Sequence, residues 1–190
     1  MNILFFTSML AGLVTLSAYF PYIRAILKKE TRPSFISWPI WALSLSLIFA
    51  TSYSVGARLT LVLIFAGIIG NIIISILAWR YGEKTWTKLD IASIVVSIAS
   101  LVVWFITNNA LIALIMIVAI DTAGYFPTIQ NILKNPRSEN RTAWMLFGIG
   151  ALFNMVTLLI AGDFKFGVVL FPLVYFFTVG ITNIVLLLKR

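Results

Sequence analysis

Few residues in this chain could do chemistry, and one of them is a carboxylate in an unusual place. The chain contains no Cys and no His, so it has no thiol nucleophile, no imidazole base and no thiolate or imidazole metal ligand. Asp121 lies 11 residues beyond Ala110 within a long apolar segment. A carboxylate in the middle of a membrane helix is costly, and it marks a solvated cavity, an ion or proton path, or a buried partner. We therefore expect Asp121 either to bind and release a proton or to hydrogen-bond to a neighbouring helix.

Three amide side chains share this apolar setting. Asn71, Asn154 and Asn183 each interrupt an apolar segment, and an amide offers the paired donor and acceptor groups that suit a small polar solute. Together with Asp121 they form the predicted solute-binding set. For Asn154 the alternative is helix packing, because polar side chains also hold membrane helices together. The sequence contains no cluster of acids and no metal-ligand set, so we expect neither an enzyme nor a bound metal or cofactor.

The elements that must position these side chains are predicted to be membrane helices. The chain has 190 residues, of which 61% are hydrophobic and 11% charged, a composition that excludes a water-soluble domain. Only Asn108 and Asn109 separate the fourth apolar run from the fifth, but one helix across both would far exceed the bilayer thickness. Runs long enough to cross a bilayer can be placed at residues 3–27, 36–54, 59–79, 89–107, 110–133, 143–161 and 167–188.

Positive charges give these segments a direction. The formal net charge is +8, yet Lys and Arg occur singly or in short groups between apolar runs, which is typical of topology signals and not of nucleic-acid binding. With seven crossings, all but two of the 14 Lys and Arg residues fall on one side, the exceptions being Arg58 and Lys165. The positive-inside rule then predicts a multi-pass protein of the cell (inner) membrane, with the C-terminus in the cytoplasm and the N-terminus outside.

A ten-residue sequence occurs twice. Residues 19–28 read Tyr-Phe-Pro-Tyr-Ile-Arg-Ala-Ile-Leu-Lys, and residues 125–134, which begin 106 positions later, read Tyr-Phe-Pro-Thr-Ile-Gln-Asn-Ile-Leu-Lys, with seven of ten positions identical. Both copies end a helix on the basic side, so the repeats are parallel and one extra helix must lie between them. We therefore predict an all-α membrane fold with three-helix repeats at 1–81 and 110–190, joined by an inverting linker helix at 82–109.

The repeat also pairs residues that could move or gate the two halves. Pro21 and Pro127 are mates, and because proline interrupts helical hydrogen bonding we expect them to act as hinges. The plainer explanation is that proline is frequent in membrane helices. Arg24 and Gln130 are mates one turn further on and form a predicted cytoplasmic gate, although Arg24 could instead extend to the membrane interface.

Tryptophans and small residues are predicted to place the helices. Trp38, Trp41 and Trp144 lie near cytoplasmic helix ends, where we expect them to anchor the protein at the membrane interface. Small residues at 66–70 and 148–151 should let helices approach closely, within the bundle or between subunits. Because one chain supplies both repeats, an oligomer is possible but not required.

These motifs resemble those of the PQ-loop superfamily, which includes the SWEET sugar carriers and the KDEL receptors. The likeness rests on the aromatic-Pro pair near the cytoplasmic end of each repeat's first helix, the basic loop after it, and the Ser or Thr with a Trp that opens the next helix. The chain would be a divergent member, because the Gln that names the motif is replaced by Tyr22 and Thr128. Residues 31–34 and 135–139 resemble those of a little-characterised group of bacterial members.

The resemblance implies a seven-helix, SWEET-like fold and a function in transport. A small polar solute, either a sugar or another metabolite, would be carried by alternating access between the two bundles, with Asn71 and Asn183 lining its site. The alternative is a non-transporting receptor or regulatory protein with the same architecture.

Overall fold

Helices make up nearly all of the described chain. The computed structural model describes residues 2–31, 33, 35, 37–82, 84, 88–134 and 139–189, and these residues form no strand. Five of the helices described are long and apolar enough to cross a membrane, namely α1, α3, α4, α7 and α8. The predicted class, a helical protein with several apolar membrane-length segments, is therefore confirmed. The helices are α1 (Ile3–Leu27), α2 (Ser37–Ser54), α3 (Leu61–Tyr81), α4 (Lys88–Thr107), α5 (Ala110–Ala123), α6 (Tyr125–Lys134), α7 (Arg141–Ala161) and α8 (Phe166–Leu188).

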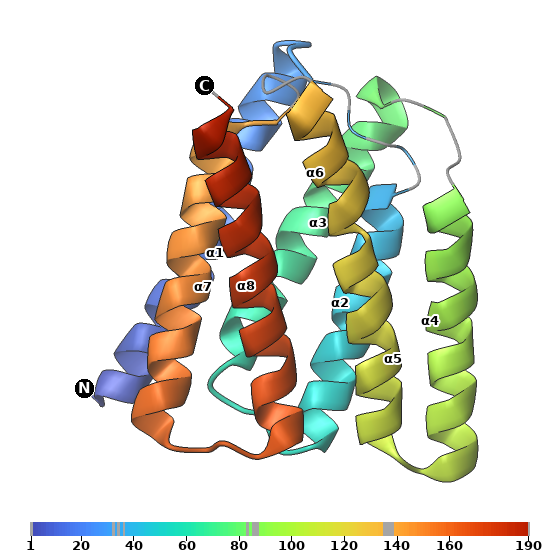
Figure 1. Cartoon of the computed structure of the whole chain (residues 1–190), viewed down its shortest axis with the longest axis vertical. Helices are drawn as coiled ribbons and strands as arrows, with labels where there is room; N and C mark the ends of the chain where they lie inside the picture. The colour runs from blue at the N-terminus through green and yellow to red at the C-terminus, as the bar shows by residue number, and fades with distance from the viewer. Residues whose placement is uncertain are drawn as a thin grey trace.

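The prediction of one continuous helix over 110–133 is wrong. The chain forms two helices here, α5 and α6, which separate at Gly124 and follow each other in nearly the same direction (Figure 1). Pro127 has no N–H to offer the carbonyl group four residues earlier, and glycine is a poor helix former. In the first copy of the repeat Ala18 replaces glycine, and α1 runs unbroken through Pro21. At this position the two copies differ by one methyl group.

The short break between α4 and α5 occurs where the sequence predicts it. Asn108 has a left-handed backbone conformation with φ of 51°, which asparagine tolerates better than most residues. Asn109 caps α5, because its side-chain oxygen accepts hydrogen bonds from the backbone N–H groups of Leu111 (3.1 Å) and Ile112 (3.3 Å). These two residues are sufficient to reverse the chain direction.

The helices form two groups of similar internal order (Figure 1). In the first group α3 packs against both α1 and α2, and in the second α8 packs against both α7 and the α5–α6 segment. The groups meet where α1 packs along α7 and where α2 packs against α5. α4 lies at one edge, against α5 and α2.

The interior changes in character along the helix direction. At the end that holds the α2–α3 and α7–α8 connections, the core is mainly aliphatic, with Ile48, Ile64, Leu114 and Leu158 buried together. Towards the opposite end the buried residues are largely aromatic, including Tyr19 and Trp38 with Trp41, Tyr22 and Phe147 packed against them. The site described below lies where these two regions meet.

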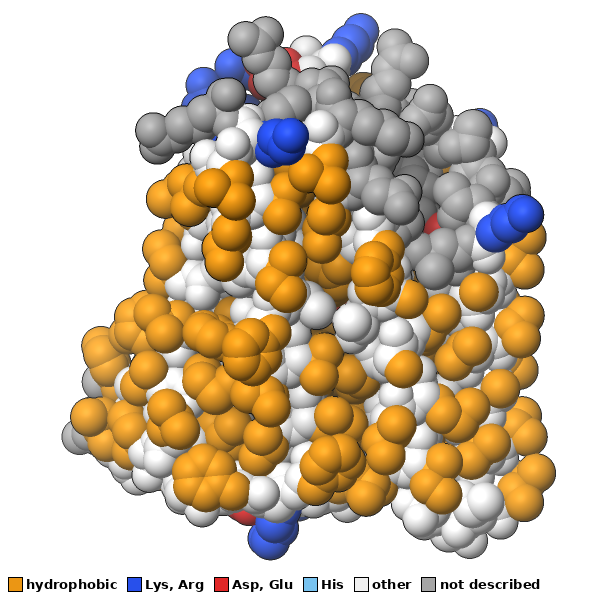
Figure 2. Space-filling view, viewed as in Figure 1, with side chains coloured by type: hydrophobic (Ala, Val, Ile, Leu, Met, Phe, Trp, Pro, Cys, Tyr) orange, Lys and Arg blue, Asp and Glu red, His pale blue; other side chains and the backbone are white. Residues whose placement is uncertain are grey.

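The surface has the distribution expected of a protein in lipid. On the face shown in Figure 2, hydrophobic side chains cover the sides of the helices, while Lys and Arg lie at the ends. Every Lys and Arg side chain that the structure describes is exposed, near a helix end or in a connection. The large exposed side chains along the helices include Phe105 (87% exposed), Trp79 and Ile76, which a membrane would cover.

Small residues allow close helix contacts, as predicted. A Cβ atom added at Gly70 would overlap the Tyr19 ring of α1, and one added at Gly150 would overlap the Thr15 hydroxyl of α1. The expectation of an interfacial anchor needs correction for Trp38, which is only 8% exposed and contacts the rings of Tyr22 (5.2 Å) and Trp41 (5.3 Å) inside the protein. Trp41 and Trp144 are partly buried, and their role as anchors stays a prediction.

Candidate functional site

The Asp121 carboxylate lies among three tyrosines from other helices. Tyr19 of α1, Tyr125 of α6 and Tyr175 of α8 lie within electrostatic range of Asp121 of α5. Tyr19 is 5% exposed, and the other three residues are partly buried. We call these four residues the central cluster. It draws on both helix groups, since α1 belongs to the first and the other helices to the second.

In the first group, the central cluster is fixed to α3 by a buried hydrogen bond. The Tyr19 hydroxyl donates to Asn71 Oδ1 (2.9 Å), and the Gly67 carbonyl lies 3.2 Å from the same hydroxyl. The ring lies directly on Gly70, and its edge meets Phe147 of α7 at 5.0 Å between ring centroids. The predicted site residue Asn71 is thus buried at 5% exposure and borders the cluster through Tyr19.

In the second group, Tyr125 lies near the Thr178 side chain on α8, whose hydroxyl hydrogen-bonds to the Val174 carbonyl of its own helix (3.0 Å). The Tyr125 ring meets that of Trp144 at 6.0 Å between centroids. Tyr19 and Tyr125 are mates in the sequence repeat, and each of them lies near a polar side chain on the last helix of its group. Tyr175 is held by stacking on Phe171 (5.5 Å).

The Asp121 carboxylate makes no hydrogen bond or ion pair with any residue that the structure describes. The described Lys and Arg side chains are exposed at helix ends and connections, so none of them compensates its charge. The hydrogen bond to a neighbouring helix that was one of two expectations for Asp121 is not formed among these residues. A partly buried carboxylate without a partner is an acceptor for a proton or for a cationic ligand.

The two remaining predicted amides lie elsewhere. Asn183 donates from Nδ2 to the Trp144 carbonyl (2.8 Å) and to the Val179 carbonyl (3.0 Å), so its amide connects α8 to α7. Asn154 is 1% exposed, and neither its nitrogen nor its oxygen has a hydrogen-bond partner in the described part of the chain. It shares a face of α7 with Gly150 and with Thr157, which hydrogen-bonds to Thr7 of α1 (2.8 Å). Asn154 therefore belongs to the α1–α7 contact.

The predicted hinge and gate residues are only partly described. Pro21 lies inside α1, two residues beyond Tyr19, so the predicted hinge adjoins the central cluster. Arg24 is exposed in the last turn of α1. The side chains of their mates Pro127 and Gln130 lie outside the described residues, as does the loop at 135–138. The gate and the paired hinges remain predictions.

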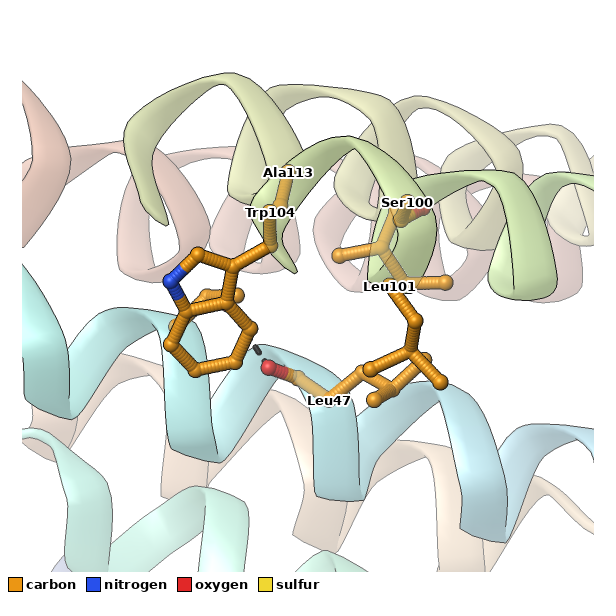
Figure 3. A pocket seen from close by; sticks show the side chains of 7 residues that line it. Leu47, Ser100, Leu101, Trp104 and Ala113 are labelled. Atoms are coloured by element: carbon orange, nitrogen blue, oxygen red, sulfur yellow. Dashed lines mark hydrogen bonds between the residues drawn. The ribbon is translucent and has the colours of Figure 1, made fainter. Parts of the chain in front are cut away.

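A crevice beside α4 is too small and too apolar to compete with the central cluster as a solute site. Its lining includes Trp104, Leu101 and Ser100 of α4, which face Leu47 of α2 (Figure 3). It encloses essentially no space for a solute, whereas typical ligand sites have roughly 300–1,000 Å³. The Ser100 hydroxyl donates its proton to the Val96 carbonyl (2.6 Å), so it has no free donor for a ligand. No group of three or more metal-ligating side chains occurs among the described residues either.

Sequence reasoning missed the tyrosines and Thr178. Tyr19 and Tyr125 were visible in the sequence as repeated residues, but the repetition did not indicate their position near Asp121. Tyr175 and Thr178 carried no signal of their own in the sequence.

Comparison with known proteins does not assign this chain to a family. The chain matches no protein-family model, no curated protein sequence and no solved structure at a significant level.

Proposed function

We propose that this protein is a membrane carrier for a small polar solute, such as a sugar or another metabolite, and that it works by alternating access between two three-helix bundles. The observation that carries the proposal is the central cluster. An uncompensated carboxylate and three tyrosines, two of them repeat mates, meet at the junction of two helix groups, and such junctions are where carriers built from repeats bind their solutes.

The order of helix packing supports a parallel 3+1+3 repeat. If α1, α2 and α3 correspond to α5–α6, α7 and α8, the last helix of each group packs between the other two. The two contacts between the groups are then mates as well, because α1 with α7 corresponds to α5 with α2. α4 is the inverting helix. This symmetry favours the PQ-loop architecture, which the sequence resembles, and a pseudo-twofold axis along the membrane normal.

The topology proposed for the carrier follows from the charges. The C-terminus lies at the end of the molecule where α1 and α3 end and α7 begins, and the N-terminus lies towards the other end (Figure 1). The exposed residues Lys28, Lys84, Arg141 and Lys189 adjoin these helix ends at the C-terminal side, whereas Arg58 and Lys165 lie in the α2–α3 and α7–α8 connections. The positive-inside rule places the end that holds the C-terminus in the cytoplasm, with the protein in the cell (inner) membrane. The aliphatic core then closes the outer half of the protein.

In the transport cycle, the parts of α1 and α5 that hold Tyr19 and Asp121 would move relative to their neighbours. Opening to the outside requires α1 to separate from α7 at the Thr7–Thr157 hydrogen bond, while Pro21 lets the cytoplasmic end of α1 move independently. Asp121 would bind a proton in one half of the cycle and release it in the other, which couples solute movement to the proton gradient.

The experiment is thermal unfolding of the purified protein in detergent against a panel of metabolites at two pH values, with Asp121→Asn as the variant. A solute that binds only the folded protein raises its stability by mass action. We expect stabilisation by one class of small solutes, and we expect the pH dependence of this effect to disappear in Asp121→Asn. Asp163→Asn is the control, because Asp163 lies in the α7–α8 connection beside Lys165 (3.7 Å).

Two results would count against the carrier. Failure of every small solute to stabilise the protein, together with stabilisation by peptides or a co-purifying protein, would favour the receptor alternative. An unchanged pH dependence in Asp121→Asn would remove the proton-coupling role and leave a facilitator.

A further inference from the structure

We infer that the carrier opens to the outside along only one of its two bundle contacts, the contact between α1 and α7, and that the solute enters between these helices. The mate contact between α2 and α5 stays closed and acts as the pivot. The inference rests on the proposed carrier function and names the route by which its solute enters. It comes from polar groups that are buried in the α1–α7 contact without hydrogen-bond partners in the described part of the chain.

Small and polar side chains follow one another along the α1–α7 contact. Near its outer end in the proposed topology, the hydroxyl groups of Thr7 and Thr157 are hydrogen-bonded at 2.8 Å. About two turns further along α1, the Thr15 hydroxyl lies against Gly150 of α7, and Tyr19 follows after one more turn. From Thr7 to Tyr19 this line covers about 18 Å of helix, more than half of the hydrocarbon thickness of about 30 Å. We call the following residues the outer seam: Thr7, Ala11, Thr15, Gly150, Asn154 and Thr157.

Among the described residues, three polar atoms of the outer seam are buried without a hydrogen-bond partner. Asn154 and Thr15 are each 1% exposed, and the unpaired atoms are the amide nitrogen and oxygen of Asn154 and the hydroxyl oxygen of Thr15. A polar side chain that holds two membrane helices together bonds across their contact, as Thr157 does, so helix packing does not account for Asn154. Unpaired buried polar groups destabilise the closed contact. Water or a polar solute between the helices would supply the missing partners.

The mate contact between α2 and α5 has apolar side chains at the corresponding positions. The repeat offset of 106 residues relates Asn154 to Ile48 and Ala11 to Ile117. Both isoleucines are 0% exposed and belong to the aliphatic core. Separating α2 from α5 would expose these side chains to water, which the hydrophobic effect opposes. The two contacts are therefore related by the repeat but differ in how easily they open.

One opening contact and one closed contact give the movement a direction. If α2 and α5 stay packed, the two helix groups separate on the side where α1 meets α7. A solute that enters there meets the hydroxyl groups of Thr7 and Thr157 first, and then Asn154 and Thr15. Hydroxyl and amide groups both donate and accept hydrogen bonds, so the opened seam can replace water around a polar solute.

Cysteine accessibility tests the route, because the chain has no cysteine of its own. Ala11→Cys places a thiol in the outer seam, and Ala113→Cys places one at the α2–α5 contact, where Ala113 borders Leu47 and Thr51. Both alanines are at most 1% exposed. The whole protein in right-side-out vesicles would be treated from outside with a membrane-impermeant thiol reagent. We expect Ala11→Cys to react at least about tenfold faster than Ala113→Cys, which corresponds to about 1.4 kcal/mol.

Removal of the unpaired groups should keep the outer seam closed. Thr15→Val preserves the shape of the side chain and removes its hydroxyl, and Asn154→Ala removes the amide. Combined with Ala11→Cys, each should slow the reaction from outside by about fivefold or more, and Thr15→Val should also raise the Tm. Ser52→Ala is the matched control, because it removes a buried hydroxyl that has no partner among the described residues but lies on α2, outside the α1–α7 contact. It should leave the reaction rate of Ala11→Cys unchanged.

Three results would overturn the inference. Equal reaction rates of Ala113→Cys and Ala11→Cys would mean that both contacts open, and failure of Ala11→Cys to react, although the unfolded protein reacts fully, would mean that this contact stays closed. Unchanged rates in both Thr15→Val and Asn154→Ala would separate opening from the unpaired groups. In each case, stabilisation by a metabolite from the panel would preserve the carrier proposal. A protein that no small solute stabilises, and whose Ala11→Cys thiol does not react, would overturn both.

Discussion

At the scale of single residues, polar groups within apolar segments could be recognised in the sequence as candidate site residues. Their hydrogen-bond partners could not be predicted. Asp121 could be singled out from its depth in a helix, and Asn71 from its apolar surroundings. The partner of Asn71 is Tyr19, which a search for polar residues passes over because tyrosine is half apolar. The family resemblance paired Asn183 with Asn71 as residues that line the site. Yet the repeat offset of 106 residues takes Asn71 to within one position of Thr178, and Thr178 is the residue near the second tyrosine.

Replacement of Gly70 tests the packing of the Tyr19 ring against α3. In Gly70→Ala the new methyl group would overlap the ring, so either the ring or α3 must shift, and overpacking of this kind typically costs about 1–3 kcal/mol. Gly180→Ala is the matched control, because it is also within a long helix but has no atom within 4 Å of the added Cβ. Thermal unfolding in detergent should show a lower Tm for Gly70→Ala and an unchanged or higher Tm for Gly180→Ala. Equal Tm values would contradict the packing described here.

Glu139 gives a pH dependence that lies outside the membrane segments. Burial raises the pKa of its carboxyl group above the ordinary value, and the hydrogen bond from Trp144 Nε1 (3.0 Å) only partly opposes this. A raised pKa in the folded state means that the associated stability is complete below the unfolded pKa of about 4.3 and is lost as the pH rises through the folded pKa.

The Glu139→Gln variant isolates this contribution. Glutamine stays neutral and can still accept the Trp144 hydrogen bond, so the Tm of the variant relative to the natural protein should rise as the pH increases from acid to neutral. Glu30→Gln is the control, since Glu30 is exposed beside Lys28 (3.8 Å). Parallel Tm profiles for Glu139→Gln and the natural protein would show that Glu139 does not titrate as described.

At the scale of helices, hydropathy was sufficient for most boundaries. Apolar runs end where charged or asparagine residues begin, and the ends of α1, α2 and α4 fall where the sequence predicts them. The break between α5 and α6 was not predicted, because hydropathy is insensitive to backbone conformation. Gly124 is as compatible with an apolar helix as Ala18 by that measure, and a proline follows three residues later in both copies. Which helices pack against each other could not be predicted from the sequence either, since many pairs of helices would bury similar apolar areas.

The cap at Asn109 tests the least conspicuous helix boundary. Asn109→Ala removes the acceptor for two backbone N–H groups at the start of α5, so stability should fall by about 1 kcal/mol. Asn109→Asp keeps an acceptor at the same place and should retain most of the stability. Chemical or thermal unfolding of the two variants checks this, and a loss of the same size in both would assign the effect to something other than the cap.

At the scale of the whole molecule, the repeat and the helix packing agree with each other. The sequence relates Tyr19 to Tyr125 by a fixed offset, and the fold brings both beside Asp121 from opposite helix groups. The sequence repeat could suggest two bundles, but it could not show which surfaces join them. The α1–α7 contact depends on small residues and hydroxyls, such as Gly150 and Thr157, whose partners are distant in the chain.

The most direct test of the central claim is whether the central cluster can be reached from both sides of the membrane. The chain has no cysteine, so Thr178→Cys creates a single thiol beside Tyr125. It would be treated with a membrane-impermeant thiol reagent in right-side-out and inside-out vesicles. Thr107→Cys, at the exposed end of α4, is the control and should react from one side only.

The carrier proposal predicts that Thr178→Cys reacts from both sides, and that a bound solute slows both reactions. Reaction from one side only, or from neither side although the unfolded protein reacts fully, would contradict alternating access around this site.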